Sequence, residues 1–221
     1  ALENPEHPVV AIVGGSKIST KLNVLNNIVK KAEYLILGGA MANTFLHAQG
    51  ADVGASLCET EMKEEALKIL QTAKDANCEI VLPVDCVVAK ELRANAENQT
   101  VDAQSIPDGY MAIDIGPQSI AAYQKIFENC KTLLWNGPMG VFEIKPFDAG
   151  TNALAQTAAT LTKAGKLKSI AGGGDTVSAL ENAEVVGEFT YVSTAGGAFL
   201  EWLEGKSLPG VAALENAKKA A

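Results

Sequence analysis

Short apolar runs alternate along the chain with longer segments in which apolar and polar residues are mixed. Most of the short runs are apolar throughout, which is typical of strands covered on both faces in a parallel sheet. We therefore predict strands at Val9–Val13, Tyr34–Leu37, Glu79–Val84, Ala112–Ile115, Thr132–Trp135, Lys168–Ala171 and Phe189–Val192.

The longer segments have the apolar spacing of amphipathic helices. We predict helices at Ser19–Lys31, Thr60–Ala76, Ser119–Asn129, Phe147–Ala164, Asp175–Ala183 and Gly197–Leu203. Alternating strands and helices predict an α/β fold, a doubly wound, Rossmann-like and mainly parallel sheet of about six strands with helices on both faces.

The segment Lys90–Gly109 interrupts this alternation, because it is polar and lacks a period. We interpret it as a long excursion or a small hairpin rather than a domain boundary. Residues 1–221 are therefore expected to form one domain. The last residues, Lys218–Ala221, are expected to be a frayed helix end.

Composition and charge exclude several classes of protein. The 221 residues are 48% hydrophobic and carry a net charge of -8, so a core is possible and non-specific binding to nucleic acid or acidic membrane is disfavoured. No apolar run approaches the ~20 residues of a membrane span, and no leader is visible. The four cysteines form no Cys-x-x-Cys pair, which favours buried thiols in a reducing compartment over a disulfide or zinc framework. We expect a cytoplasmic monomer.

Glycines follow most of the predicted strands. They occur at Gly14–Gly15, Gly38–Gly39, Gly116, Gly137, Gly172–Gly174 and Gly196–Gly197. Carboxyl ends of parallel strands lie at one edge of a sheet, where ligands bind, and helices that begin there present free N–H groups to phosphate. Tight turns alone would explain a few such glycines, but the whole set predicts a polyanionic ligand. The sequence contains neither a P-loop nor a complete Gly-x-Gly-x-x-Gly fingerprint.

Charged residues near these glycines are candidate ligand contacts. Lys17 and Lys21 are four residues apart, so on a helix both ammonium groups would face the same anion; the alternative is a solvated helix start. Asp175 suits either an N-cap or a Mg²⁺ ligand. Glu143 could bind a ribose hydroxyl, although an ordinary surface acid is favoured. No residue set suggests a covalent nucleophile, so we infer a nucleotide ligand with Mg²⁺ and phosphoryl-transfer chemistry.

Several motifs together identify a family resemblance that covers essentially the whole chain. The chain resembles the nucleotide-binding, C-terminal half of phosphoglycerate kinases. The motifs are Gly14–Lys21, Leu82–Asp85, Leu134–Glu143, Gly172–Thr176, Ser193–Thr194 with Gly196–Ala198, and Leu208–Gly210.

The resemblance implies reversible phosphoryl transfer in glycolysis, from ATP to 3-phosphoglycerate, giving ADP and 1,3-bisphosphoglycerate. It implies that Lys17 contacts the phosphoryl group in flight and that the turn Gly172, Gly173, Gly174 aims a helix N-terminus at that group. Lys21 would contact nucleotide phosphates, Asp175 would serve Mg²⁺, and Thr176 would contact a phosphate.

The resemblance also implies a binding slot for the adenosine part of ATP or ADP. The implied nucleotide-binding residues here are Gly15, Ser16, Gly38, Gly39, Ala112, Ile113, Asn136, Pro138 and Glu143, with Ile113 packing on the base and Glu143 reaching the ribose. The chain departs from the family pattern at Ala40, Ala112 and Ala195, where glycine is usual, and at Leu92, where an aromatic residue is usual.

The family's N-terminal domain, which carries the basic patch for 3-phosphoglycerate, has no counterpart in this sequence. Arg93 is the sequence's only arginine, in agreement with that gap. We expect a domain from a two-domain kinase that binds Mg-nucleotide but does not turn over alone. The alternatives are a stand-alone nucleotide-binding or regulatory module and, with less support, an NAD-dependent oxidoreductase.

Overall fold

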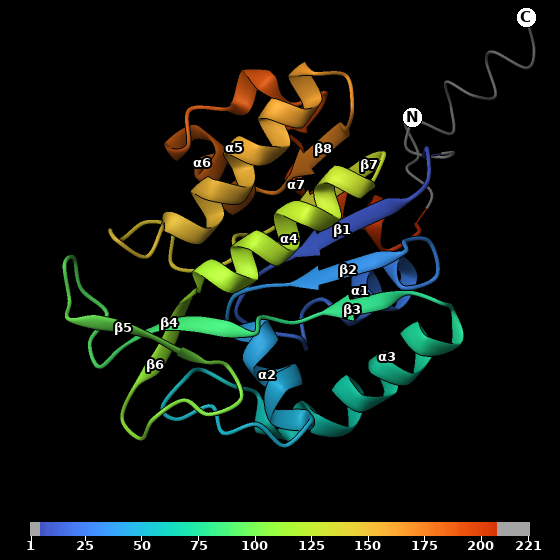
Figure 1. Ribbon diagram of the computed structural model, residues 1–221. Coiled ribbons are helices and arrows are strands. Elements are labelled where there is room, and N and C mark those ends of the chain that lie inside the picture. The colour runs from blue at the N-terminus through green and yellow to red at the C-terminus, as the bar shows by residue number, and fades with distance from the viewer. Residues whose placement is uncertain (1–4, 207–221) are drawn as a thin grey trace, which may run out of the picture.

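The computed structural model describes residues 5–206, and the motif Leu208–Gly210 and the end Lys218–Ala221 lie outside them (Figure 1). The strands are β1 Val9–Val13, β2 Tyr34–Leu37, β3 Glu79–Val81, β4 Asp85–Ala89, β5 Asn98–Asp102, β6 Met111–Ile115, β7 Thr132–Asn136, β8 Lys168–Gly172 and β9 Tyr191–Ser193. The α-helices are α1 Leu22–Ile28, α2 Ala40–Ala48, α3 Lys63–Asp75, α4 Pro117–Asn129, α5 Ala149–Lys163, α6 Gly174–Asn182 and α7 Gly196–Leu203. The 3-10 helices are η1 Thr60–Met62 and η2 Val186–Glu188.

The main sheet confirms the predicted fold class. It has six strands in the order β3-β2-β1-β7-β8-β9, and every pair is parallel. The central strand β1 is buried throughout, because helices cover both faces of the sheet. Val9, Ala11 and Val13 pack in one core with residues of α1, α2, α3 and α7. Val10 and Ile12 pack in a second core with residues of α4, α5 and α6.

The predicted strand Ala112–Ile115 is real, but its assignment to the parallel sheet was wrong. It is part of β6, which pairs antiparallel with β4 in a separate sheet of order β5-β4-β6. An apolar run shows burial but does not specify which strand it pairs with. The polar segment Lys90–Gly109 contains β5, which forms the predicted hairpin with β4. The small sheet lies beyond the arrowheads of β1 and β2, at the carboxyl edge of the main sheet (Figure 1).

Several predicted boundaries also shift. The run Glu79–Val84 is divided, because β3 ends at Val81 and Pro83 separates it from β4. The last strand begins at Tyr191 instead of Phe189, and α2 was not predicted as an element. No helix within residues 5–206 is long and apolar enough to cross a membrane.

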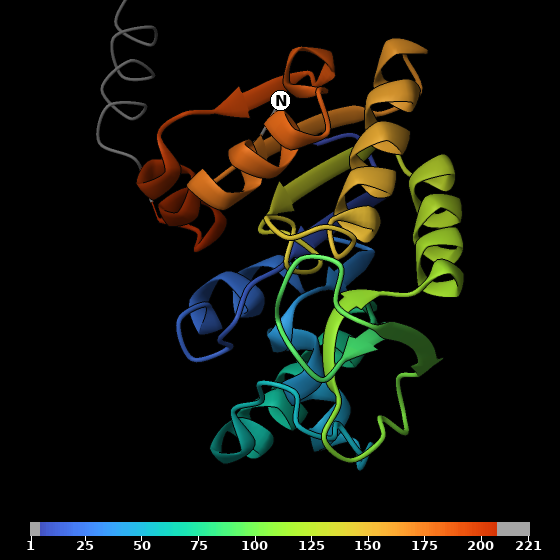
Figure 2. The ribbon, with the colours of Figure 1, turned by 90° about the vertical axis from the view of Figure 1, so that its left-hand side faces the viewer.

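A buried carboxylate joins the small sheet to the main body. Asp85, the first residue of β4, accepts hydrogen bonds from the backbone N–H groups of Gln118 and Ser119 at 2.9 and 2.8 Å. These amides belong to the first turn of α4, where no residue of the helix itself is available as an acceptor. Asp85 of the small sheet therefore caps α4, a helix that packs on the main sheet. Figure 2 shows the small sheet in green beside α4.

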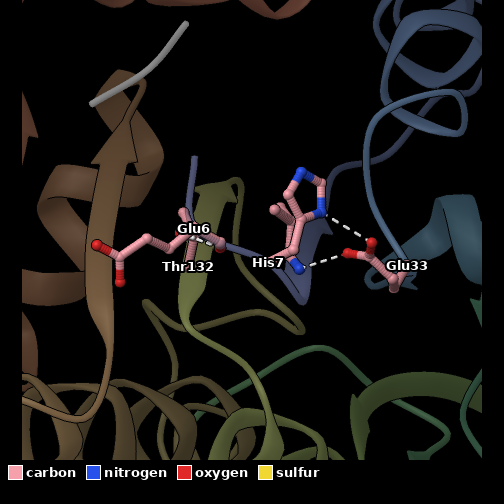
Figure 3. A network of polar contacts seen from close by, with 5 residues as sticks. Glu6, His7, Glu33 and Thr132 are labelled. Carbon is pink, nitrogen blue, oxygen red and sulfur yellow. Dashed lines mark hydrogen bonds and ion pairs between the residues drawn. The ribbon is translucent and has the colours of Figure 1, made fainter. Parts of the chain in front are cut away.

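Polar contacts fix the opposite, amino edge of the main sheet (Figure 3). The Nδ1 atom of His7 lies 2.8 Å from a carboxylate oxygen of Glu33, and the other oxygen of Glu33 accepts the N–H of Val9. The hydroxyl of Thr132 donates to the carbonyl of Glu6 at 2.7 Å. These bonds hold the segment entering β1 between β2 and β7. A hollow of about 790 Å³ lies beside them, and it is lined by none of the predicted site residues.

Candidate functional site

The loops that follow β1, β2 and β7 meet at the carboxyl edge of the main sheet. The N–H of Gly14 donates to the backbone carbonyl of Asn136 at 2.8 Å, and the N–H of Gly39 donates to the backbone carbonyl of Met139 at 2.8 Å. The N–H of Met41 donates to the backbone carbonyl of Gly15 at 2.9 Å. The predicted gathering of glycine-rich loops at one edge is therefore present. Gly116 is the exception, because its strand belongs to the small sheet.

Some of these glycines are required by the crossing of the loops themselves. A Cβ atom on Gly14 would lie 1.9 Å from the carbonyl oxygen of Pro138, and Gly38 and Gly137 are packed in a similar way against Met139 and Gly14. In contrast, a Cβ atom on Gly174 would meet nothing within 4 Å. Gly174 is the first residue of α6, so open space lies in front of that helix N-terminus.

A cavity of about 380 Å³ opens at this edge, between the main sheet and the small sheet. The predicted site residues that line it are Gly15, Ser16, Gly39, Ala112, Ile113, Pro138, Glu143 and Asp175. Leu92 and Ala40, named as departures from the family pattern, line it as well. Apolar side chains form much of the wall, while Glu143 and Asp175 are exposed acids. This combination suits a ligand with a flat apolar part and a polar part.

Lys21 points inward and is held by the loops. Its Nζ atom donates to the carbonyl of Gly14 at 2.8 Å and to Oδ1 of Asn136 at 2.6 Å. Burial lowers the pKa of this ammonium group to about 8, because water no longer solvates the charged form, although the nearby Asp175 carboxylate opposes the shift.

The predicted geometry of Lys17 and Lys21 on one helix face was wrong. Helix α1 begins at Leu22, not at Ser19, so Lys17 lies in the preceding loop and its side chain is exposed. The loop is fastened elsewhere, since the backbone N–H and hydroxyl of Ser19 both donate to Glu59. Lys17 therefore projects from a positioned loop, whereas Lys21 is fixed within the fold.

Asn136 and Thr176 connect the ends of β7 and β8 beneath the edge. The Nδ2 atom of Asn136 donates to Gly172 at 2.7 Å, and the hydroxyl of Thr176 donates to the same carbonyl at 2.9 Å. The hydroxyl of Thr176 also accepts the N–H of Gly137 at 2.7 Å. Both side chains are buried and used within the fold, so Lys21, Asn136 and Thr176 form one network under the site.

Asp175 lies in the first turn of α6 but does not cap it. The N-cap is Gly173, with a positive φ of 104°, and no side-chain hydrogen bond caps the helix. The N-cap interpretation of Asp175 is therefore wrong, and its exposed carboxylate faces the cavity. No cluster of three or more metal-ligating side chains occurs in the part of the chain that the structure describes. A single carboxylate would suit Mg²⁺ only together with phosphate and water oxygens, which Mg²⁺ commonly keeps as its other ligands.

Leu57 and Asp114 are among the cavity-lining residues that the sequence analysis did not identify as site residues. Leu57 is 57% exposed although it is a large apolar residue, and it lies on a loop that carries no periodic signal. Asp114 is 3% exposed and lines the cavity from β6. The signal in the sequence is a single acid within the otherwise apolar predicted strand Ala112–Ile115.

The fold and the site together define a class of protein. A doubly wound parallel sheet with a ligand cavity at its carboxyl edge, beside a helix N-terminus, is typical of nucleotide-binding α/β domains.

Comparison with known proteins narrows this class to one family. The family model for phosphoglycerate kinase matches residues 1–206. A phosphoglycerate kinase of Methylorubrum extorquens is 61% identical over 213 residues, which are 96% of this chain and 53% of that protein. One from Rhizobium meliloti is 60% identical over 95% of this chain and 53% of its own length. The chain belongs to the phosphoglycerate kinase family.

Solved structures agree with this assignment. The structure of phosphoglycerate kinase from Coxiella burnetii superposes with a TM-score of 0.91 at 46% identity, covering 97% of this chain and 54% of that chain. The enzyme from Pyrococcus horikoshii gives a TM-score of 0.73 at 29% identity. The chain spans about half the length of the relatives it matches.

Proposed function

We propose that this chain is the nucleotide-binding half of a kinase that transfers a phosphoryl group reversibly between 1,3-bisphosphoglycerate and ADP, giving 3-phosphoglycerate and ATP. The observation that carries the proposal is the cavity of about 380 Å³, whose lining combines apolar side chains with residues of the glycine loops and Asp175. The remaining half of the enzyme would supply the site for 3-phosphoglycerate. We propose that the complete enzyme acts as a cytoplasmic monomer.

The adenosine part of the nucleotide would occupy the apolar part of the cavity. Ala112 and Ile113 of β6 would pack on one face of the base, and Gly38, Gly39 and Pro138 would border it. Gly15, Ser16 and Asn136 would flank the sugar and phosphates. Glu143 is exposed at the rim, where a ribose hydroxyl could donate to its carboxylate.

The phosphates would extend toward the turn Gly172, Gly173, Gly174, which leads from β8 into the N-terminus of α6. Free N–H groups in the first turn of a helix stabilise negative charge without any reorganisation. Thr176 would contribute through its backbone, since its hydroxyl is already bonded on both sides. Asp175 would hold Mg²⁺, which neutralises phosphate charge when bound.

The two lysines would have different tasks. Lys21 is fixed next to the loops, so its ammonium group would bind nucleotide phosphates from below. Lys17 is exposed on its loop and is free to follow the phosphoryl group as it moves between donor and acceptor. Charge that develops on this group in the transition state would strengthen the contact with Lys17, so that residue would act mainly on the rate.

Titration calorimetry of the chain with MgADP tests the proposal. We expect a saturable isotherm and, with 1,3-bisphosphoglycerate added, no turnover. A folded sample that binds no MgADP would contradict the proposal. In the complete enzyme, Lys17→Ala should lower kcat by a much larger factor than it weakens MgADP binding, and equal losses would contradict its assigned task.

The alternative of a regulatory nucleotide-binding module predicts the same isotherm. The two functions differ in what precedes the chain in its gene. An upstream domain rich in arginine and histidine supports the kinase, whereas a native start at Ala1 supports the module.

A further inference from the structure

Asp114 is a buried acid that the proposed mechanism does not use. It lies in β6, directly after Ile113, and its side chain is almost completely removed from water. Buried carboxylates are unfavourable unless they are paired or hydrogen-bonded, so its contacts indicate what it does.

The carboxylate of Asp114 bonds to backbone N–H groups of its own strand and of α5. One oxygen accepts the N–H of Gly150 at 2.7 Å, and the other accepts the N–H of Ile115 at 2.8 Å. Gly150 belongs to the first turn of α5, whose free amides and positive dipole end stabilise a negative charge. Asp114 therefore caps α5 from the small sheet, as Asp85 caps α4.

Two glycines without side chains pack closely against the carboxylate of Asp114. A Cβ atom on Gly140 would lie 2.4 Å from Oδ1 of Asp114, and one on Gly150 would lie 2.5 Å from the same oxygen. The N–H of Val141 also donates to the carbonyl of Ile113 at 3.0 Å. Asp114 thus lies where β6 meets both the Gly140–Phe142 segment and α5.

β6 and the Gly140–Phe142 segment form adjoining parts of the cavity wall. Ala112 and Ile113 contribute from β6, while Gly140, Val141 and Phe142 contribute from the other segment. Their relative position sets the shape of the space that a flat base could occupy. The carboxylate of Asp114 packs against Gly140 and is bonded to Gly150 of α5, so it fixes where β6 lies relative to both.

We propose that Asp114 is a positioning residue for the base-binding part of the cavity, holding β6 against Gly140 and the start of α5. The inference rests on the proposed function, because it assumes that a nucleotide base occupies this cavity. It assigns no contact between Asp114 and the phosphates. Loss of its carboxylate should therefore weaken recognition of the base and sugar and spare recognition of a phosphate group alone.

Calorimetry with two probes, MgADP and magnesium pyrophosphate, tests this separation. Asp114→Ala should weaken MgADP binding about tenfold, the effect expected for losing a buried hydrogen bond, and leave pyrophosphate binding unchanged. Asp114→Asn keeps an oxygen that can accept from Gly150, so it should recover part of the lost affinity. If Asp114→Ala does not fold, the smaller loss expected for Asp114→Asn relative to the wild-type chain is the deciding measurement.

Asp85→Asn is the matched control, because Asp85 is also a buried acid that caps a helix from the small sheet but does not line the cavity. It should lower thermal stability without changing the affinity for either probe. Unchanged MgADP binding in the Asp114 variants, equal losses for the two probes, or an equal loss in Asp85→Asn would each overturn the inference. A wild-type chain that binds pyrophosphate but not MgADP would instead defeat the proposed function, and the inference with it.

Discussion

The ammonium nitrogen of Lys21 lies 2.6 Å from Oδ1 of Asn136, a residue 115 positions further along the chain. This bond joins the loop after β1 to the end of β7. Asn136 continues the connection to β8 through the carbonyl of Gly172. The strand ends that form the proposed phosphate site are thus held together by one buried side-chain network.

Replacing Asn136 should therefore reduce the stability of the fold. Asn136→Ala removes one partner of a buried ammonium group and one donor to Gly172, which we expect to cost about 2–3 kcal/mol. Urea unfolding measures this difference. Asn26→Ala, at an exposed position of α1, is the control and should change stability by less than about 0.5 kcal/mol. Equal midpoints for the two variants would show that the network contributes little.

Lys21 should make stability depend on pH in the alkaline range. Its pKa is lowered from 10.5 to about 8 in the folded chain, so between these values the unfolded chain binds more protons than the folded one. Stability contributed by this group should accordingly rise as pH increases from about 8 to 10.5. Comparing the pH profiles of the wild-type chain and Lys21→Met isolates the effect. If the stability of the two proteins changes with pH in the same way, titration of Lys21 does not contribute to stability in this range.

The same group should couple nucleotide binding to proton uptake. Phosphates close to Lys21 favour its charged form, so MgADP binding above about pH 8 should take up protons. Calorimetry in buffers of different ionisation enthalpy counts these protons. Lys21→Met should abolish the uptake, whereas Lys30→Met, at an exposed position far from the cavity, should retain it.

Two glycines of the site should respond differently to the same change. Gly14→Ala places a methyl group against the carbonyl of Pro138 and should destabilise the fold by about 3 kcal/mol. Gly174→Ala adds a methyl group in open space, so stability should change little, but MgADP should bind more weakly because the phosphates approach this position. Thermal unfolding and calorimetry on the same samples separate the two effects. Tight MgADP binding by Gly174→Ala would argue against phosphate at α6.

Asp175 should affect metal-dependent binding and not the fold. Because its carboxylate makes no capping bond, Asp175→Asn should lower the unfolding temperature only slightly, through the lost attraction to Lys21, while the affinity for MgADP falls toward that for ADP without magnesium. Glu181→Gln, an exposed acid on the same helix, is the control. A large drop in unfolding temperature for Asp175→Asn, with MgADP affinity unchanged, would show that the carboxylate serves the fold and not the metal.

Local features of the sequence account for much of what was predicted correctly. Apolar runs such as Val9–Val13 identified the strands of the main sheet, because burial on both faces leaves a continuous apolar pattern. Glycines after those strands identified the edge, because close loop crossings and positive φ angles, as at Gly39 and Gly173, favour residues without a side chain.

The features that were not predicted correctly depend on contacts between segments that are distant in the sequence. Which strand β6 pairs with, whether Lys21 turns inward, and what the carboxylate of Asp114 bonds to all depend on residues far away in the chain. The sequence by itself determined the fold class, the family resemblance and the glycine-rich edge. Only the tertiary structure decided how the small sheet is fastened and which charges are buried, because pairing and burial are set by neighbours that local sequence patterns do not identify.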